Sequence, residues 1–169
     1  KNIALITDAG TPAVSDPGEI LVKKCYESGI EVTSLPGPSA VITALTLSGL
    51  STGRFTFEGF LPQDKTYRNE ILEELRQEYR TMVIYEAPHH LKATLDDLYG
   101  CLGDRRITIL RELTKKHEEV LKFTVKEAVD YYENEEPRGE FVLVIEGKDK
   151  NEEKQVKIAI YTDMDIEEH

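Results

Sequence analysis

The sequence predicts an α/β fold, and three observations lead to this prediction. Segments rich in Val, Ile and Thr alternate along the chain with amphipathic segments of helical spacing. Apolar residues make up 40% of the chain and charged residues 31%, which is typical of a folded globular protein and excludes disorder throughout. The length of 169 residues suits one ordinary domain or two small ones.

The first fifty residues are expected to hold two strands and two helices. The strands cover residues 3–7 and 31–35, and the helices cover residues 17–28 and 39–47. Pro17 suits the first turn of one helix, Gly29 suits its left-handed end, and Ser39 is well placed to cap the next helix. Two parallel strands make a poor core, so we expect this half to lack strands that precede it in a longer protein.

The rest of the chain is expected to form a second α/β unit with a mixed sheet. Its strands are predicted over residues 55–60, 81–86, 106–112, 119–124 and 141–146, and its helices over residues 66–79, 88–99 and 125–133. Glycines at both ends of residues 49–53 indicate a hinge before this unit. The predicted domains are therefore residues 1–52 and 53–147, followed by an acidic tail, residues 148–169, that packs poorly.

The charge balance limits which partners the chain can hold. There are 21 Lys and Arg residues against 32 Asp and Glu residues, a net charge of −11. This argues against bulk electrostatic binding of nucleic acid or anionic lipid, although a local basic patch remains possible. No apolar run is long enough to cross a membrane. The two cysteines, Cys25 and Cys101, are too few for a disulfide framework or a cysteine zinc site and favour a cytoplasmic location.

Two loops between a predicted strand and a predicted helix are candidate binding loops. Residues 7–18 have the sequence TDAGTPAVSDPG, and residues 35–40 have the sequence LPGPSA. Ligands of α/β sheets collect at such positions, where Asp8 can accept hydrogen bonds from a hydroxyl or an amine. Both loops can equally be rigid turns whose polar side chains cap backbone amides. On consecutive strands they would lie side by side and form one crevice, but neither has the glycine pattern of a phosphate cradle.

Two stretches of the second unit also follow predicted strands. Residues 85–90, with the sequence YEAPHH, favour a helix start, and the adjacent His89 and His90 would point about 100° apart on a helix, so we expect no metal site. Residues 111–119, with the sequence RELTKKHEE, are either a solvated loop or a local cationic spot for an anionic substrate. Lys65 and Arg68 can extend that spot.

Six segments carry a family resemblance in their residues and in their order: residues 7–18, 35–47, 59–62, 85–91, 111–119 and 139–147. They resemble the tetrapyrrole methylase superfamily of S-adenosylmethionine-dependent methyltransferases. The strings DAGTPAVSDPG and ELTKKHEE are the most specific, and they are most similar to the ribosomal RNA small subunit methyltransferase I family. The glycine-rich first motif of that family is absent, and His90 stands where the family usually has Arg. We therefore expect a two-domain fold whose first domain is incomplete.

The resemblance implies that S-adenosylmethionine lies in a cleft between two α/β domains. It assigns the cofactor contacts to Thr7, Asp8, Thr11, Ser39, Ala40, Glu86 and Leu113. Lys115 and His117 are expected to serve phosphate contacts or proton traffic, with Lys65 as a further substrate contact. The reaction it implies is an in-line methyl transfer to a cytidine ribose 2′-oxygen in small-subunit ribosomal RNA. That reaction requires alignment and a proton route but no metal.

The resemblance also implies partners and leaves alternatives. The expected partners are small-subunit ribosomal RNA or the small ribosomal subunit and a second copy of the chain, with no membrane. One alternative keeps the fold but makes the substrate a tetrapyrrole or a protein side chain. Another is a binding module that catalyses nothing, because the first cofactor motif is absent. The string at residues 112–119 favours the RNA substrate.

Overall fold

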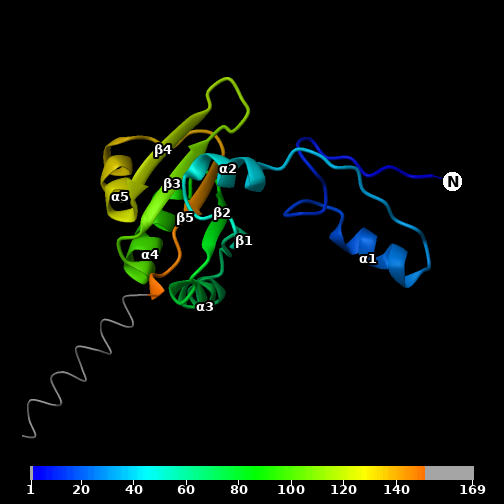
Figure 1. Cartoon of the computed structure of the whole chain (residues 1–169), viewed down its shortest axis with the longest axis horizontal. Coiled ribbons are helices and arrows are strands. Elements are labelled where there is room, and N and C mark those ends of the chain that lie inside the picture. Colours follow the sequence, from blue (N-terminus) through cyan, green and yellow to red (C-terminus); the bar gives the residue numbers. More distant parts are fainter. Residues whose placement is uncertain (1, 151–169) are drawn as a thin grey trace, which may run out of the picture.

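A five-stranded sheet forms the centre of the computed structural model, which describes residues 2–150 (Figure 1). The strands are β1 (Phe55–Phe60), β2 (Thr81–Glu86), β3 (Arg106–Arg111), β4 (Glu119–Thr124) and β5 (Phe141–Ile145). The helices are α1 (Glu19–Glu27), α2 (Ala40–Ser48), α3 (Lys65–Arg76), α4 (Leu91–Leu102) and α5 (Val125–Asn134). The predicted α/β class is therefore confirmed.

The sheet is mixed, as predicted, with the strand order β1-β2-β5-β3-β4. β1 and β2 are parallel, and β5 is antiparallel to both of its neighbours, β2 and β3. β4 is antiparallel to β3. As a result β1, β2 and β3 all end at one edge of the sheet, where β5 begins. We call this the carboxyl edge.

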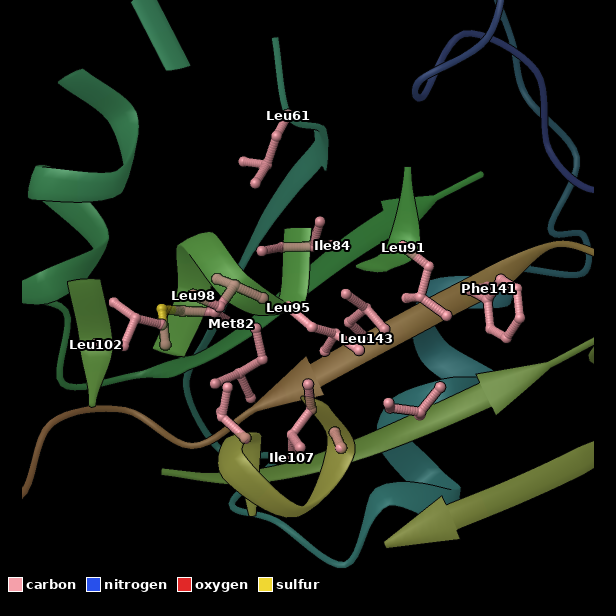
Figure 2. Packing of buried hydrophobic residues seen from close by; sticks show 14 of the residues in the cluster. Leu61, Met82, Ile84, Leu91, Leu95, Leu98, Leu102, Ile107, Phe141 and Leu143 are labelled. Atoms are coloured by element: carbon pink, nitrogen blue, oxygen red, sulfur yellow. The ribbon is translucent and has the colours of Figure 1, made fainter. Parts of the chain in front are cut away.

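Helices cover both faces of the sheet because the side chains of its strands alternate between two apolar clusters. The larger cluster joins α3, α4 and α5 to one face, with Leu91, Leu95 and Leu98 of α4 fully buried (Figure 2). On the opposite face, Val41, Ala44 and Leu45 of α2 pack against Val83 and Val144 of the central strands. α2 thus forms a third layer.

The segment predicted to be a hinge is fastened to the sheet. The Thr108 hydroxyl donates to the carbonyl oxygen of Ser48 at 2.9 Å, and the Thr81 hydroxyl donates to that of Ser51 at 2.6 Å. Gly49 ends α2 in the left-handed region, at φ 72°. α2, which the predicted domain division places in the first unit, therefore lies on the sheet of the second.

The strands predicted over residues 3–7 and 31–35 are wrong. Among residues 2–150, no strand precedes β1, and α1 buries no side chain. Ile3 is 89% exposed and Leu35 is 83% exposed. A strand needs a partner to complete its backbone hydrogen bonds, and neither segment lies on the sheet. Figure 1 shows this region, in blue, extending away from the other elements.

Most other predicted elements are confirmed to within about three residues. The helix expected at residues 88–99 begins later, at Leu91, because residues 87–90 form a turn. His90 is the N-cap of the helix. No helix in the described part of the chain is long and apolar enough to cross a membrane. Lys148 donates from its backbone to the carbonyl oxygen of Glu78 at 2.7 Å. The rest of the predicted tail, residues 151–169, lies outside the described residues.

Candidate functional site

The two candidate loops meet, as predicted, although no strand precedes either of them. The Thr11 hydroxyl donates to the carbonyl oxygen of Pro38 at 3.1 Å. Glycines on both sides make this contact possible: a Cβ on Gly37 would lie 2.9 Å from the Thr11 hydroxyl oxygen, and one on Gly10 would lie 3.3 Å from the Pro38 oxygen. Thr11 and Ser39, two of the predicted cofactor contacts, are thereby brought close together.

The first loop also touches the carboxyl edge of the sheet. A Cβ on Gly59, near the end of β1, would lie 2.7 Å from the Ser15 hydroxyl oxygen. Gly59 has a φ of +63°, and Ala13 and Ser15 also have positive φ. Thr7 is half-buried in this loop, and Asp8 is exposed with its carboxylate in solvent.

The second loop leads into α2 on the same face of the sheet as Leu113. Ser39 caps α2 by accepting a hydrogen bond from the Ile42 backbone at 3.5 Å, and Ala40 is the first residue of the helix. Leu113 and Tyr85 are partly buried against the apolar cluster that α2 forms with the sheet. The structure thus places Ser39, Ala40 and Leu113 on one side of the carboxyl edge.

Tyr85 lies in this group, and the sequence argument did not single it out as a site residue. Burial raises the pKa of its phenol, and a hydrogen bond to the Val41 backbone partly offsets the shift. Its ring packs edge-to-face against Phe57, with the centroids 4.9 Å apart. A half-buried aromatic residue at the end of a strand is common in cores, which is why its sequence position alone did not reveal it.

Glu86 is a buried carboxylate at the end of β2, with an exposed fraction of 4%. One of its oxygens accepts a hydrogen bond from the Ala87 backbone at 2.7 Å, and the other accepts one from the Thr94 hydroxyl at 2.5 Å. Thr94 in turn accepts from Arg68 at 2.8 Å. Both Glu86 oxygens therefore have partners inside the protein, and the carboxylate orders the turn between β2 and α4.

Arg68 does not contribute a free positive charge to the surface. Its guanidinium lies 2.7 Å from the Asp97 carboxylate, and it also donates to Thr94. Lys65 is the exposed first residue of α3, whose helix covers the face opposite to α2. Lys65 and Leu113 therefore lie toward opposite faces of the sheet.

The loop after β3 holds Lys115 between two carboxylates. Its ammonium lies 3.0 Å from the Glu112 carboxylate and 2.8 Å from the Glu140 carboxylate. The pKa of Lys115 is raised mainly by its hydrogen bond to Glu140 and, to a smaller extent, by its hydrogen bond to Glu112. The pKa of Glu112 is lowered mainly by a hydrogen bond from the Glu140 backbone N–H and then by the one from Lys115. His117 is exposed in the same loop. We call Glu112, Lys115 and Glu140 the carboxylate clasp.

The clasp depends on a close backbone approach that the sequence did not reveal. Glu112 has a positive φ of 49°, and its side chain lies over Gly139, where a Cβ would come within 2.6 Å of its Cγ. Glu140, which follows Gly139, was not among the predicted site residues. It is 25 positions from Lys115, so spacing alone could not pair the two charges.

A broad open hollow of about 1130 Å³ lies at the other edge of the sheet. Arg106 at its rim forms an ion pair with Glu146. None of the predicted site residues lines this hollow, so its size does not make it the candidate site. No cluster of metal-binding side chains is found within residues 2–150.

The fold and the paired loops define a class of protein, and comparison with known proteins identifies it. A family profile named Tetrapyrrole (Corrin/Porphyrin) Methylases matches residues 1–129, so the chain belongs to this family. Among curated proteins it is similar to ribosomal RNA small subunit methyltransferase I of Synechocystis, with 52% identity over 87% of the chain and 53% of that protein. The chain spans about half the length of several such curated relatives.

Solved structures agree on the fold. The methyltransferase CobJ is 19% identical, covers 82% of the chain and 62% of its own length, and superimposes with a TM-score of 0.62. Uroporphyrin-III C-methyltransferase from Thermus thermophilus, solved with S-adenosyl homocysteine, is 18% identical with a TM-score of 0.56. The matched region covers 80% of this chain and 62% of that protein. At these identities the likeness concerns the fold alone.

Proposed function

We propose that the protein is an S-adenosylmethionine-dependent methyltransferase that modifies a cytidine ribose 2′-oxygen in small-subunit ribosomal RNA. The observation that carries the proposal is the 52% identity to a relative named ribosomal RNA small subunit methyltransferase I. Seven further relatives with the same name are 42–47% identical to the chain. The string at residues 112–119, whose resemblance favoured RNA over a tetrapyrrole, agrees with these names.

The residues at the meeting of the two loops fit such a cofactor. Asp8 offers an exposed carboxylate for hydroxyl or ammonium groups, and the glycines beside Thr11 and Pro38 leave backbone atoms accessible. Leu113, which packs against the apolar cluster, and Ala40, the first residue of α2, provide apolar groups for a flat ring or the methyl-bearing region. In this proposal Thr7, Asp8, Thr11, Ser39, Ala40 and Leu113 contact the cofactor, and Glu86 holds the turn behind them.

The chemistry requires mainly alignment. The cofactor supplies a methyl group on a sulfonium, which is already a good leaving group. The protein has to place the ribose oxygen in line with that methyl group, and its own residues do so by holding the RNA. Lys65, Lys115 and His117 are the proposed contacts to RNA phosphates, and the proton of the hydroxyl leaves by a route that we do not assign to one residue.

The partners form part of the same proposal. We propose the small ribosomal subunit or its RNA as the substrate and a second copy of the chain as the partner of a homodimer, in the cytoplasm. The division into a cofactor domain, residues 1–52, and a second domain, residues 53–147, also remains a proposal. The position of α2 on the sheet indicates that the boundary region packs with the second domain.

The test measures methyl transfer from labelled S-adenosylmethionine to small ribosomal subunits. It uses the full-length product of the gene, with this chain alone in parallel, and we expect the chain alone to bind the cofactor weakly or not at all. Asp8→Asn should lower cofactor affinity or rate at least severalfold, because a charged acceptor is lost. Asp96→Asn, which changes an exposed carboxylate on α4, is the matched control. Methylation of a tetrapyrrole with none on ribosomal RNA would contradict the proposal.

A further inference from the structure

A β-bulge near the end of β1 changes which way its last side chain faces. Phe57 pairs with Val83, but Gly59 pairs with Ile84 and Phe60 pairs with Tyr85, so β1 has one residue more than β2 over this stretch. Side chains alternate along a strand, so without the extra residue Phe60 would face α3 and α4. The bulge instead puts Phe60 on the same face as Phe57 and Tyr85.

Phe60 remains exposed in this position. Its exposed fraction is 57%, whereas that of the next residue, Leu61, is 3%. Its ring lies edge-to-face against Tyr85, with the centroids 5.6 Å apart and an interplanar angle of 63°. Burying an aromatic side chain stabilises a fold, and the bulge leaves Phe60 without that gain because its ring stays open to solvent.

The surroundings of Phe60 are those of the candidate site. Gly59, directly before it, lies against Ser15 of the first loop. The rings of His89 and His90 lie 4.0 Å apart in the turn that follows the neighbouring strand β2. Aromatic and imidazole rings thus gather at the ends of β1 and β2. They lie beside the face that α2 covers, because Val41 of α2 and Phe57 of β1 belong to the same apolar cluster.

We propose that Phe60 is a platform on which an unpaired base of the RNA substrate stacks. This inference rests on the proposed function and adds a residue that recognises the substrate. A base has two flat faces and can stack on an exposed aromatic side chain, whichever of the four bases it is. The chain carries a net charge of −11, so it cannot hold RNA by overall electrostatic attraction. Stacking supplies affinity that does not need a positive field.

The position of Phe60 favours an RNA base over the adenine of the cofactor. β1 is one of the two edge strands of the sheet, and the ring of Phe60 is open to solvent there. The proposed cofactor contacts are in the two loops, at the start of α2 and at Leu113, and Phe60 is not among them. An exposed ring on an edge strand is accessible to a nucleic-acid strand that extends beyond the two cofactor loops.

The experiment compares Phe60→Leu and Phe60→Tyr with the unchanged full-length protein. Phe60→Leu keeps an apolar side chain but removes the aromatic face, and Phe60→Tyr keeps that face. Tyr67→Leu is the matched control, because Tyr67 is also 57% exposed but lies on α3. Binding of a short single-stranded RNA that contains 2-aminopurine is measured by anisotropy and by quenching of its fluorescence. Inorganic polyphosphate serves as a ligand without bases, and urea unfolding checks that each variant folds.

We expect Phe60→Leu to weaken RNA binding about fivefold or more and to abolish the quenching, with polyphosphate binding unchanged. Phe60→Tyr and Tyr67→Leu should bind as the unchanged protein does. Unchanged RNA affinity in Phe60→Leu would overturn the inference. So would a loss of cofactor affinity alone, which would assign the ring to adenine, or a shift in sedimentation, which would assign it to a contact between copies. Methyl transfer by the unchanged protein to small ribosomal subunits tests the underlying function separately.

Discussion

The hydroxyl of Thr11 and the carbonyl oxygen of Pro38 join two loops that are 27 residues apart in the sequence. This hydrogen bond is the direct link between the two predicted cofactor loops. The glycines at positions 10 and 37 leave room for it. The geometry of the proposed cofactor site therefore depends in part on this exposed neutral hydrogen bond.

Removing that bond should loosen the cofactor site more than the fold. Thr11→Val keeps the shape of the side chain but cannot donate to Pro38, and a bond of this kind contributes about 0.5–1.5 kcal/mol. In the full-length protein we expect a roughly three- to tenfold loss of S-adenosylmethionine affinity by calorimetry, with an unchanged urea midpoint. Thr46→Val is the control, because its hydroxyl donates to the carbonyl oxygen of Ile42 at 2.8 Å within α2. Equal cofactor affinity in Thr11→Val and the unchanged protein would contradict this role.

The ion pairs of the carboxylate clasp should weaken RNA binding, because they compete with RNA phosphates for Lys115. Glu140 is 81% exposed, and an exposed ion pair of this kind contributes at most about 1 kcal/mol, so an RNA phosphate can replace it. Glu140→Gln should therefore strengthen RNA binding about two- to fivefold, and Lys115→Met should weaken it and lower the salt slope by about one. Lys126→Met removes an equal charge from α5, where Lys126 pairs with Asp130, and should change neither quantity. Anisotropy titrations over a range of KCl concentrations measure both.

Charged and neutral buried hydrogen bonds should differ in their contribution to stability. Thr94→Val leaves one oxygen of the buried Glu86 carboxylate without its partner, and we expect it to lower the free energy of unfolding by about 2–3 kcal/mol. Thr108→Val removes a buried neutral bond to the carbonyl oxygen of Ser48 and should lower it by about 1 kcal/mol. Urea denaturation at pH 7 compares the two, and equal losses would show that Glu86 finds another partner.

The pair of Glu78 and Arg80 should make stability depend on pH in the acid range. The side-chain hydrogen bond from Arg80 lowers the pKa of Glu78 from 4.5 to about 2. A carboxyl with a depressed pKa in the folded state contributes stability above pH 4.5, and this contribution is lost as the pH falls toward 2. At pH 7, Glu78→Gln should cost about 1 kcal/mol, because Arg80 is partly exposed. The difference in the free energy of unfolding between Glu78→Gln and the unchanged protein should shrink between pH 4.5 and pH 3.

The control for Glu78→Gln is Glu73→Gln, a substitution on α3. Glu73 lies 3.5 Å from Arg76, and both side chains are mostly exposed, so this variant should change stability by less than about 0.5 kcal/mol at either pH. If the Glu78→Gln difference stays constant from pH 7 to pH 3, the carboxylate is not held in its charged form by Arg80.

The second half of the chain could be predicted from the sequence because its patterns are local. The spacing of Leu91, Leu95 and Leu98 determines one face of α4, and the buried run Phe141–Ile145 marks a central strand. The strands predicted over residues 3–7 and 31–35 failed for the opposite reason. A strand forms only when a partner completes its hydrogen bonds, and composition does not supply the partner.

The site was predictable to a similar extent. The glycines and prolines of the two loops indicated turns that approach each other, and the bond from Thr11 to Pro38 confirms it. The bulge that turns Phe60 and the pairing of Lys115 with Glu140 depend on contacts between distant segments. Sequence spacing carries no information about such contacts, so both had to come from the structure.

The place of β5 in the sheet also determines when the fold can be completed during synthesis. β5 is the last strand among residues 2–150 but lies between β2 and β3, and it joins the β1–β2 pair to the β3–β4 pair. Until residues 141–145 leave the ribosome, β2 and β3 each present an open edge that can pair with other chains. Chaperone protection should therefore matter most in the interval between synthesis of β4 and synthesis of β5.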